Sequence, residues 1–165
     1  GFYHPEIYIK LQALLKAGQW ELAEQSETLI ALRRTPQPDD SLPLARTVAV
    51  IPASASTRVT QEGDTGVRLR AFNANPEADG VFSTLTLFWE TATTPPADAD
   101  MLLTIEARGE MRYEAILSPG SRFWPPQSWP PQAIVADRHR IPIEANAPDT
   151  TVSVKMLPMT QQRGR

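Results

Sequence analysis

The sequence predicts an α+β fold, in which an N-terminal antiparallel helical hairpin precedes an antiparallel β-sandwich. Two observations lead to this prediction. Apolar residues recur at helical spacing up to about residue 34, whereas beyond residue 46 they alternate with polar residues at a period of two. The chain also holds 16 prolines among 165 residues, and prolines in such numbers favour loops and strand edges over long helices.

The helical hairpin is predicted from two segments. The first covers residues 5–17, where Pro5 suits the first helical position, and the second runs from about Gln19 to Arg34. Gly18 separates the two segments, so they should fold back on each other, with Trp20 in the seam between them. A pair of this size buries little apolar surface by itself and needs a further surface to pack on.

The second part of the chain is predicted to be a β-sandwich. Strands are expected at 46–52, 67–72, 84–89, 101–107, 111–117, 133–143 and 150–157. About seven short strands without intervening helices indicate an immunoglobulin-like arrangement of two antiparallel sheets. Trp89 is expected on the core face with Leu85 and Leu87, and Phe72 on the face opposite Leu69.

These predictions divide the chain into four parts. They are a helical hairpin at 1–36, a linker rich in proline and aspartate at 37–45, the sandwich at 46–157 and a flexible tail at 158–165.

Composition and charge argue against several classes of function. The net charge is −3 and the basic residues are scattered, so no nucleic-acid partner is expected. The chain has no cysteine, which removes thiol nucleophiles and thiolate metal sites. No stretch has the roughly 20 apolar residues that a membrane-spanning helix needs. We expect no cofactor, no metal and no catalytic residue.

The helical segments resemble a single tetratricopeptide repeat. The resemblance lies in residues 14–23, which include Gly18, Trp20 and Ala23, and in the closing Pro36. It implies a terminal or capping repeat that serves for packing or for attachment to an upstream region.

The remainder resembles the C-terminal extracytoplasmic β-sandwich domain of bacterial multispanning, glycosyltransferase-like membrane proteins. Three segments carry this resemblance, at 66–72, 85–90 and 129–143. It implies an extracytoplasmic location in the cell envelope or outside the cell, with a tether through an upstream membrane region. It assigns no catalytic role to this domain.

The segment from Phe123 to Pro131 is the most unusual in composition, because it combines four prolines with Phe123, Trp124 and Trp129. These three aromatic residues are candidate contacts for a protein partner or a glycan, since a proline-rich backbone is already extended and presents side chains at low entropic cost. The alternative is that one tryptophan plugs the end of the sandwich while the prolines cross between the sheets. A plugging tryptophan should be fully buried.

Polar clusters offer weaker candidates. Asp137 and His139 should share one face of a strand, with Arg138 on the other, and a hydrogen bond or ion pair at a strand edge explains this trio better than a catalytic relay does. The acidic pairs Asp39-Asp40 and Asp98/Asp100 could bind calcium, but solvated turn residues are the simpler interpretation.

The sequence therefore predicts a soluble, non-catalytic accessory module of a larger, membrane-anchored bacterial protein, which mediates protein–protein contact or assembly. One alternative is a carbohydrate-binding module that uses Trp124 and Trp129. A second is a structural subunit of a homo-oligomer that shares edge strands or helices. A third is a hydrolase or transferase, which would require a deep pocket with converging carboxylates.

Overall fold

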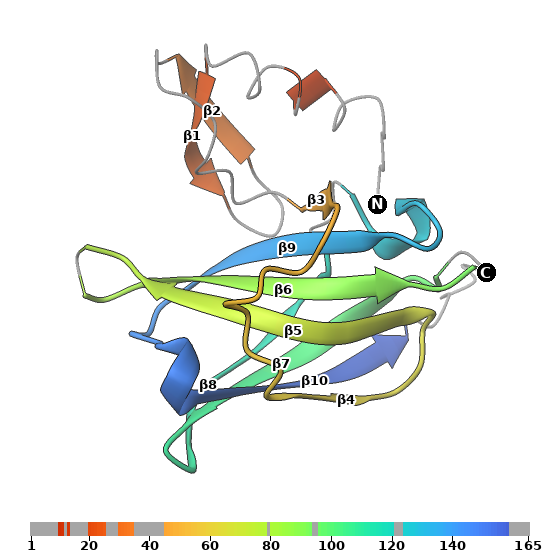
Figure 1. Ribbon diagram of the computed structural model, residues 1–165. Coiled ribbons are helices and arrows are strands. Elements are labelled where there is room, and N and C mark those ends of the chain that lie inside the picture. The colour runs from red at the N-terminus through yellow and green to blue at the C-terminus, as the bar shows by residue number, and fades with distance from the viewer. Residues whose placement is uncertain are drawn as a thin grey trace, which may run out of the picture.

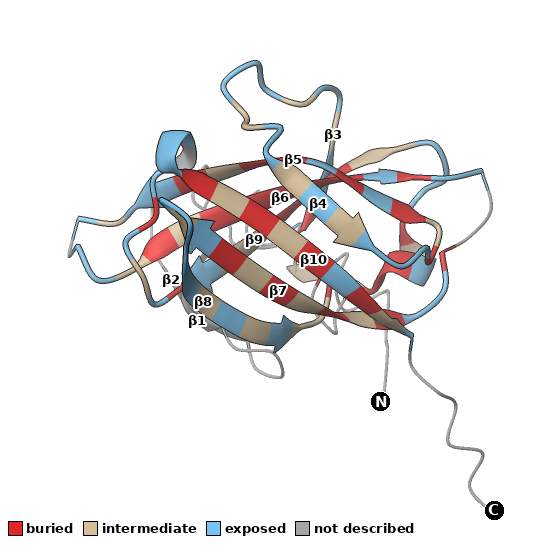
Figure 2. Cartoon of the chain, turned by 90° about the horizontal axis from the view of Figure 1, so that it is seen from below, coloured by how far each residue is buried: buried red, intermediate tan, exposed pale blue. Residues whose placement is uncertain are grey.

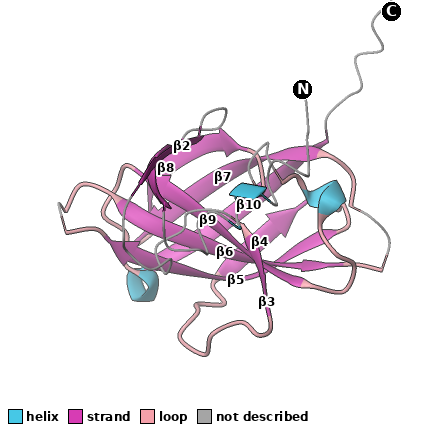
Figure 3. Ribbon diagram, turned by 90° about the horizontal axis from the view of Figure 1, so that it is seen from above, coloured by secondary structure: helices cyan, strands magenta, loops and turns pink. Residues whose placement is uncertain are grey.

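The structure is a computed structural model that describes residues 45–78, 80–93, 96–120 and 124–158, the strand backbone at 20–25 and 30–34, and residues 10, 11 and 13. Eight strands form two stacked sheets (Figures 1 and 3). The sheet strands are β3 (Arg46–Val48), β4 (Val59–Glu62), β5 (Val67–Pro76), β6 (Ser83–Thr91), β7 (Ala99–Ala107), β8 (Glu110–Leu117), β9 (Ile134–Ile141) and β10 (Thr150–Pro158). Two short 3-10 turns, η1 (Pro126–Ser128) and η2 (Ala147–Asp149), precede β9 and β10.

One sheet has the strand order β3-β9-β6-β5 and the other has the order β4-β10-β7-β8. β5 pairs with β6, and β7 with β8, as hairpins, whereas β9 and β10 each return to a strand from an earlier hairpin. All seven predicted strand regions contain a strand, which confirms the β-sandwich. The prediction missed β4, and it was wrong in making the sandwich strictly antiparallel, because β4 runs parallel to β10.

The predicted helical hairpin is wrong. Residues 20–25 and 30–34 form β1 (Trp20–Gln25) and β2 (Ile30–Arg34), an antiparallel two-stranded pair in which Leu22 lies opposite Leu32. Both segments also show apolar residues at every second position near their pairing centre, a pattern that fits a strand as well as a short piece of helix. Because the second helix is absent, this part of the chain is not a tetratricopeptide repeat, and Trp20 lies in a strand. Most of the first predicted helix, the predicted linker apart from Ala45, and the predicted tail after Pro158 lie outside the described residues.

A bulge in β5 changes which side chains enter the core. The pairing with β6 shifts between Leu69 and Ala71, so the next side chain after Leu69 that points into the core is Phe72 and not Ala71. Phe72 is fully buried in the core, so the prediction that it faces the opposite side was wrong. Ala71 faces outward and is covered, together with Phe88, by the segment that follows β3.

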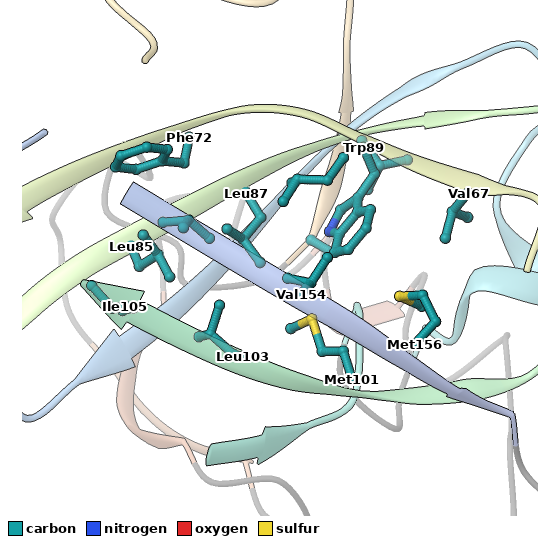
Figure 4. Packing of buried hydrophobic residues seen from close by; sticks show 14 of the residues in the cluster. Val67, Phe72, Leu85, Leu87, Trp89, Met101, Leu103, Ile105, Val154 and Met156 are labelled. Carbon is teal, nitrogen blue, oxygen red and sulfur yellow. The ribbon is translucent and has the colours of Figure 1, made fainter. Parts of the chain in front are cut away.

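The core lies between the two sheets. Leu85, Leu87 and Trp89 of β6 are fully buried, as predicted, and they pack against inward residues of β7 and β10 such as Leu103 and Val154 (Figure 4). Along β7 and β10 buried residues alternate with more exposed ones (Figure 2), which is the pattern of strands with one face in a core. The packed core gives a rigid frame for the surfaces at its edges.

Candidate functional site

The segment with two tryptophans is held against the end of the sandwich. Trp129 is only 4% exposed, and its indole Nε1 donates a hydrogen bond to the carbonyl oxygen of Trp124 at 2.9 Å. Gly120 lies beneath this ring, because a Cβ atom at residue 120 would approach the Trp129 indole to 2.8 Å. Trp129 therefore behaves as the plug described in the alternative interpretation, and its ring is not available for stacking on a sugar.

Trp124 is half-buried and packs against the core, with its ring centroid 6.0 Å from that of Trp129 and a tilt of 51° between the two rings. Phe123 lies outside the described residues. A contact through Trp124 or Phe123 stays a prediction, but the pair of exposed aromatic rings that a carbohydrate site would use is not formed by Trp124 and Trp129.

Asp137 and His139 share one face of β9, as expected, and His139 Nε2 lies 2.9 Å from Asp137 Oδ2. The shared face is the inner one, since these residues lie opposite Leu87 and Leu85 of β6. Asp137 is almost fully buried and also accepts a hydrogen bond from the Trp89 indole at 3.3 Å. The pair lies in the interior, and the hydrogen bond from Trp89 to Asp137 ties β6 to β9.

The other acidic residues that the structure describes do not gather into a cation site. Asp100 accepts a hydrogen bond from the Ser118 hydroxyl at 2.6 Å, and Asp39-Asp40 lie outside the described residues. Within the described ranges, no three histidine, aspartate or glutamate side chains gather as metal ligands.

The surface is hollowed along β5, the edge strand of its sheet. One hollow, of about 650 Å³, lies between β4 and β5, and a second, of about 490 Å³, continues toward the end of β6 and the start of β9. The two adjoin at Asp64, Val67 and Arg68, which line both. We call these two adjoining hollows together the Arg68 furrow.

The walls of the Arg68 furrow are fixed by hydrogen bonds. Gln61 of β4 reaches across to β5, where its Oε1 accepts from the Leu69 N–H at 2.7 Å and its Nε2 donates to the Val67 carbonyl at 2.9 Å. Asp64 accepts from the Gly66 N–H at 2.9 Å, which holds the turn between the two strands. Gly66 has a φ of +84°, and a Cβ there would lie 3.0 Å from Pro96, so glycine suits this turn.

Two arginines of β5 line the furrow and differ in their partners. Arg70 forms an ion pair with Glu90 of β6 at 3.2 Å, with both side chains about half exposed. Arg68 lies directly opposite Glu90 in the strand register, yet within the described part of the chain its side chain has no hydrogen-bond or ion-pair partner. Among the described residues of the furrow, Arg68 thus offers an exposed guanidinium without a hydrogen-bond or ion-pair partner.

Sequence reasoning did not find this site. The alternation around Val67 and Leu69 placed Arg68 and Arg70 on the outer face, but ordinary solvated arginines give the same pattern. The hollow depends on β4, whose four residues were not predicted as a strand, and on the reach of Gln61. No local sequence signal indicates either.

Comparison of the chain with known protein families, with curated proteins and with solved structures found no match. The β-sandwich therefore defines the class of fold, and the furrow defines the candidate site. Among the described residues, no helix combines the length and apolar character needed to cross a bilayer.

Proposed function

We propose that this chain is a non-catalytic accessory module that contacts a protein partner through the Arg68 furrow. The observation that supports the proposal best is Arg68, which lies exposed where the two hollows meet and has no ion-pair or hydrogen-bond partner in the described part of the chain. Arginine is enriched at the energetic centres of protein interfaces, because its planar guanidinium binds carboxylates and carbonyl groups with defined geometry.

The shape of the furrow favours a protein over a small molecule or a glycan. Small-molecule sites are enclosed and mostly apolar, whereas this furrow is open and has Gln61, Asp64 and Arg68 along it. No aromatic side chain of the described residues lines it, so it lacks the flat stacking surface that sugar rings prefer. Asp64 accepts a hydrogen bond from the Gly66 N–H and so holds the turn between the two walls in place before binding, which lowers the entropic cost of association.

The wider setting is proposed on the sequence resemblance alone. Segments 66–72, 85–90 and 129–143 support a place outside the cytoplasm, within a larger membrane-anchored bacterial protein. In that setting the furrow would dock the module onto a neighbouring protein of the cell envelope.

Capture and cross-linking from an extract of the source cells test the proposal. The wild-type chain is compared with Arg68→Glu and with the control Arg112→Glu. The control reverses the charge of another exposed arginine, which lies on β8 in the other sheet. A specific partner should be captured by the wild type and the control and lost with Arg68→Glu. Capture that is indifferent to Arg68→Glu would refute the furrow as the contact surface.

A glycan array probed with the same proteins and with Trp124→Ala addresses the carbohydrate alternative. We expect no glycan to be retained in a Trp124-dependent manner. Retention that disappears in Trp124→Ala would move the binding site to the end of the sandwich and contradict the proposal.

A further inference from the structure

β5 is an edge strand, and the side chain of Gln61 covers part of its outer edge, where a further strand could pair. The Gln61 amide accepts from the Leu69 N–H at 2.7 Å and donates to the Val67 carbonyl at 2.9 Å. β4 and β5 are joined by the turn at 63–66 but belong to different sheets, so no backbone ladder links them (Figure 1). Here the Gln61 amide forms the two hydrogen bonds to the β5 backbone that a neighbouring strand would form in a sheet.

The pattern of these two hydrogen bonds is specific. In a parallel ladder, one residue of the neighbouring strand donates to the carbonyl that precedes its partner residue and accepts from the N–H that follows it. The Gln61 amide makes this pair of bonds around Arg68. The side chain therefore imitates one residue of a parallel strand, in register with Arg68.

We infer that the β5 edge of the Arg68 furrow accepts a short extended peptide segment with an acidic residue, which displaces the Gln61 amide and adds to the sheet as a parallel strand. This inference rests on the proposed function and names the chemistry of the partner. Main-chain hydrogen bonds supply affinity in strand addition, and side chains supply the specificity.

The structure sets the length of the added segment. At one end the edge turns away at Gly66, and at the other Ser56 already exchanges hydrogen bonds with Phe72 at 2.8 and 2.9 Å. Residues 67–70 are left to pair. At about 3.3 Å per residue, this edge accommodates roughly four residues of an extended chain.

The position of the acidic residue follows from the register. The peptide residue that replaces the Gln61 amide lies beside Arg68, and paired residues of neighbouring strands point to the same face. A glutamate or aspartate at that position meets the free guanidinium of Arg68. The next outward arginine, Arg70, is already neutralised by Glu90, so one acidic residue is sufficient.

Titration of the ¹⁵N-labelled chain with defined peptides tests this inference. The probe is a blocked five-residue peptide of valine and threonine with a central glutamate. One control peptide carries a methyl group on the backbone nitrogen of the glutamate, which removes the N–H that would donate to the Val67 carbonyl. A second control peptide has lysine in place of glutamate. We expect shifts at the Arg68 and Leu69 amides and at least tenfold weaker binding of both controls.

Variants of the chain sharpen the test. Gln61→Ala should bind the probe several-fold more tightly because no side chain has to be displaced, and Arg112→Glu should bind it as the wild type does. Arg68→Glu should prefer the lysine peptide. The N-methyl comparison uses the wild-type chain, so it stays decisive even where Gln61→Ala does not fold.

Two outcomes would overturn strand addition. One is binding at Arg68 that is indifferent to N-methylation, which means contact through side chains alone. The other is the absence of binding by any probe to both the wild type and a folded Gln61→Ala. In either case an Arg68-dependent partner in the capture experiment would leave the proposed function standing, whereas loss of that dependence would remove the function as well.

Discussion

Three buried threonines differ in what their hydroxyl groups bind, and this difference predicts a graded response to replacement by valine. Thr65, Thr91 and Thr150 are 6%, 3% and 1% exposed. Thr91 Oγ1 donates to the Pro130 carbonyl at 2.6 Å and accepts from the Ala133 N–H at 2.9 Å. It therefore fastens the end of β6 to the turn before β9.

The other two hydroxyls make fewer bonds. Thr150 Oγ1 donates once, to the Asn146 carbonyl at 2.7 Å, while Thr65 Oγ1 has no partner among the described residues. A buried polar group without a partner costs about 1–3 kcal/mol. Thr65→Val removes such a group and should stabilise the chain by about 1 kcal/mol, because valine is close to threonine in shape.

Replacement by valine should lower the stability where the threonine hydroxyl makes hydrogen bonds. Thr150→Val should cost about 1 kcal/mol for one lost hydrogen bond. Thr91→Val should cost about 2–3 kcal/mol, since it also leaves the Ala133 N–H and the Pro130 carbonyl without their partner. For a domain of this size, each 1 kcal/mol shifts Tm by about 2–4 °C, so the extremes should differ by roughly 10 °C.

Urea unfolding followed by tryptophan fluorescence measures the series, with the buried Trp89 as a native reporter. The m value should stay constant while the midpoint rises for Thr65→Val and falls for Thr150→Val and further for Thr91→Val. A Thr65→Val variant that loses as much stability as Thr91→Val would refute the reasoning, because hydrogen bonding of the hydroxyl would then not decide the outcome.

Two further substitutions test the packing of Trp129 over Gly120 and the buried carboxylate of Asp137. Gly120→Ala should cost about 2–4 kcal/mol in thermal or urea unfolding, because φ is +69° and the new Cβ would clash with the Trp124 carbonyl oxygen. Gly109→Ala, with φ of +80° and no atom within 4 Å, is the matched control and should cost only about 1 kcal/mol; equal losses would argue against the plug. Asp137→Ala should cost about 2–4 kcal/mol and alter the near-ultraviolet signal of Trp89, whose indole loses its buried acceptor. An unchanged signal and stability would show that this bond does not hold β9 to β6.

The strands of the sandwich were largely predictable because each depends on a local pattern. Alternation of apolar and polar residues marked β5 and β6, and Arg108-Gly109 marked the turn between β7 and β8, where both residues adopt positive φ. Trp89 was correctly placed in the core for the same reason. A period of two over eight or nine residues leaves little room for another secondary structure.

The N-terminal part was not predictable in this way. β1 has six residues and β2 has five, and over such lengths helical and strand periodicities overlap. What distinguishes them is pairing between the segments, in which Leu22 meets Leu32. Local propensity carries no information about that pairing, since tertiary context overrides it.

The candidate site depends on contacts between segments that are distant along the chain. The inward position of Asp137 follows from the register of β9 against β6, and the burial of Trp129 follows from its fit over Gly120. The Arg68 furrow forms because β4 does not pair with β5, which follows it in the sequence. Instead β4 pairs in parallel with β10, about 90 residues further along the chain. Only then does the Gln61 amide meet the β5 edge.

The sequence by itself determined where the sandwich has its strands and turns, apart from β4, since these follow from side-chain alternation and from glycine and proline within a few residues of each other. The tertiary structure alone decided which strands pair, that the Leu69–Ala71 bulge turns Phe72 into the core, and that Arg68 lies exposed in a furrow whose β5 edge is covered by Gln61. These features arise from packing and hydrogen bonding between distant segments. Their free energies appear only when the two sheets come together.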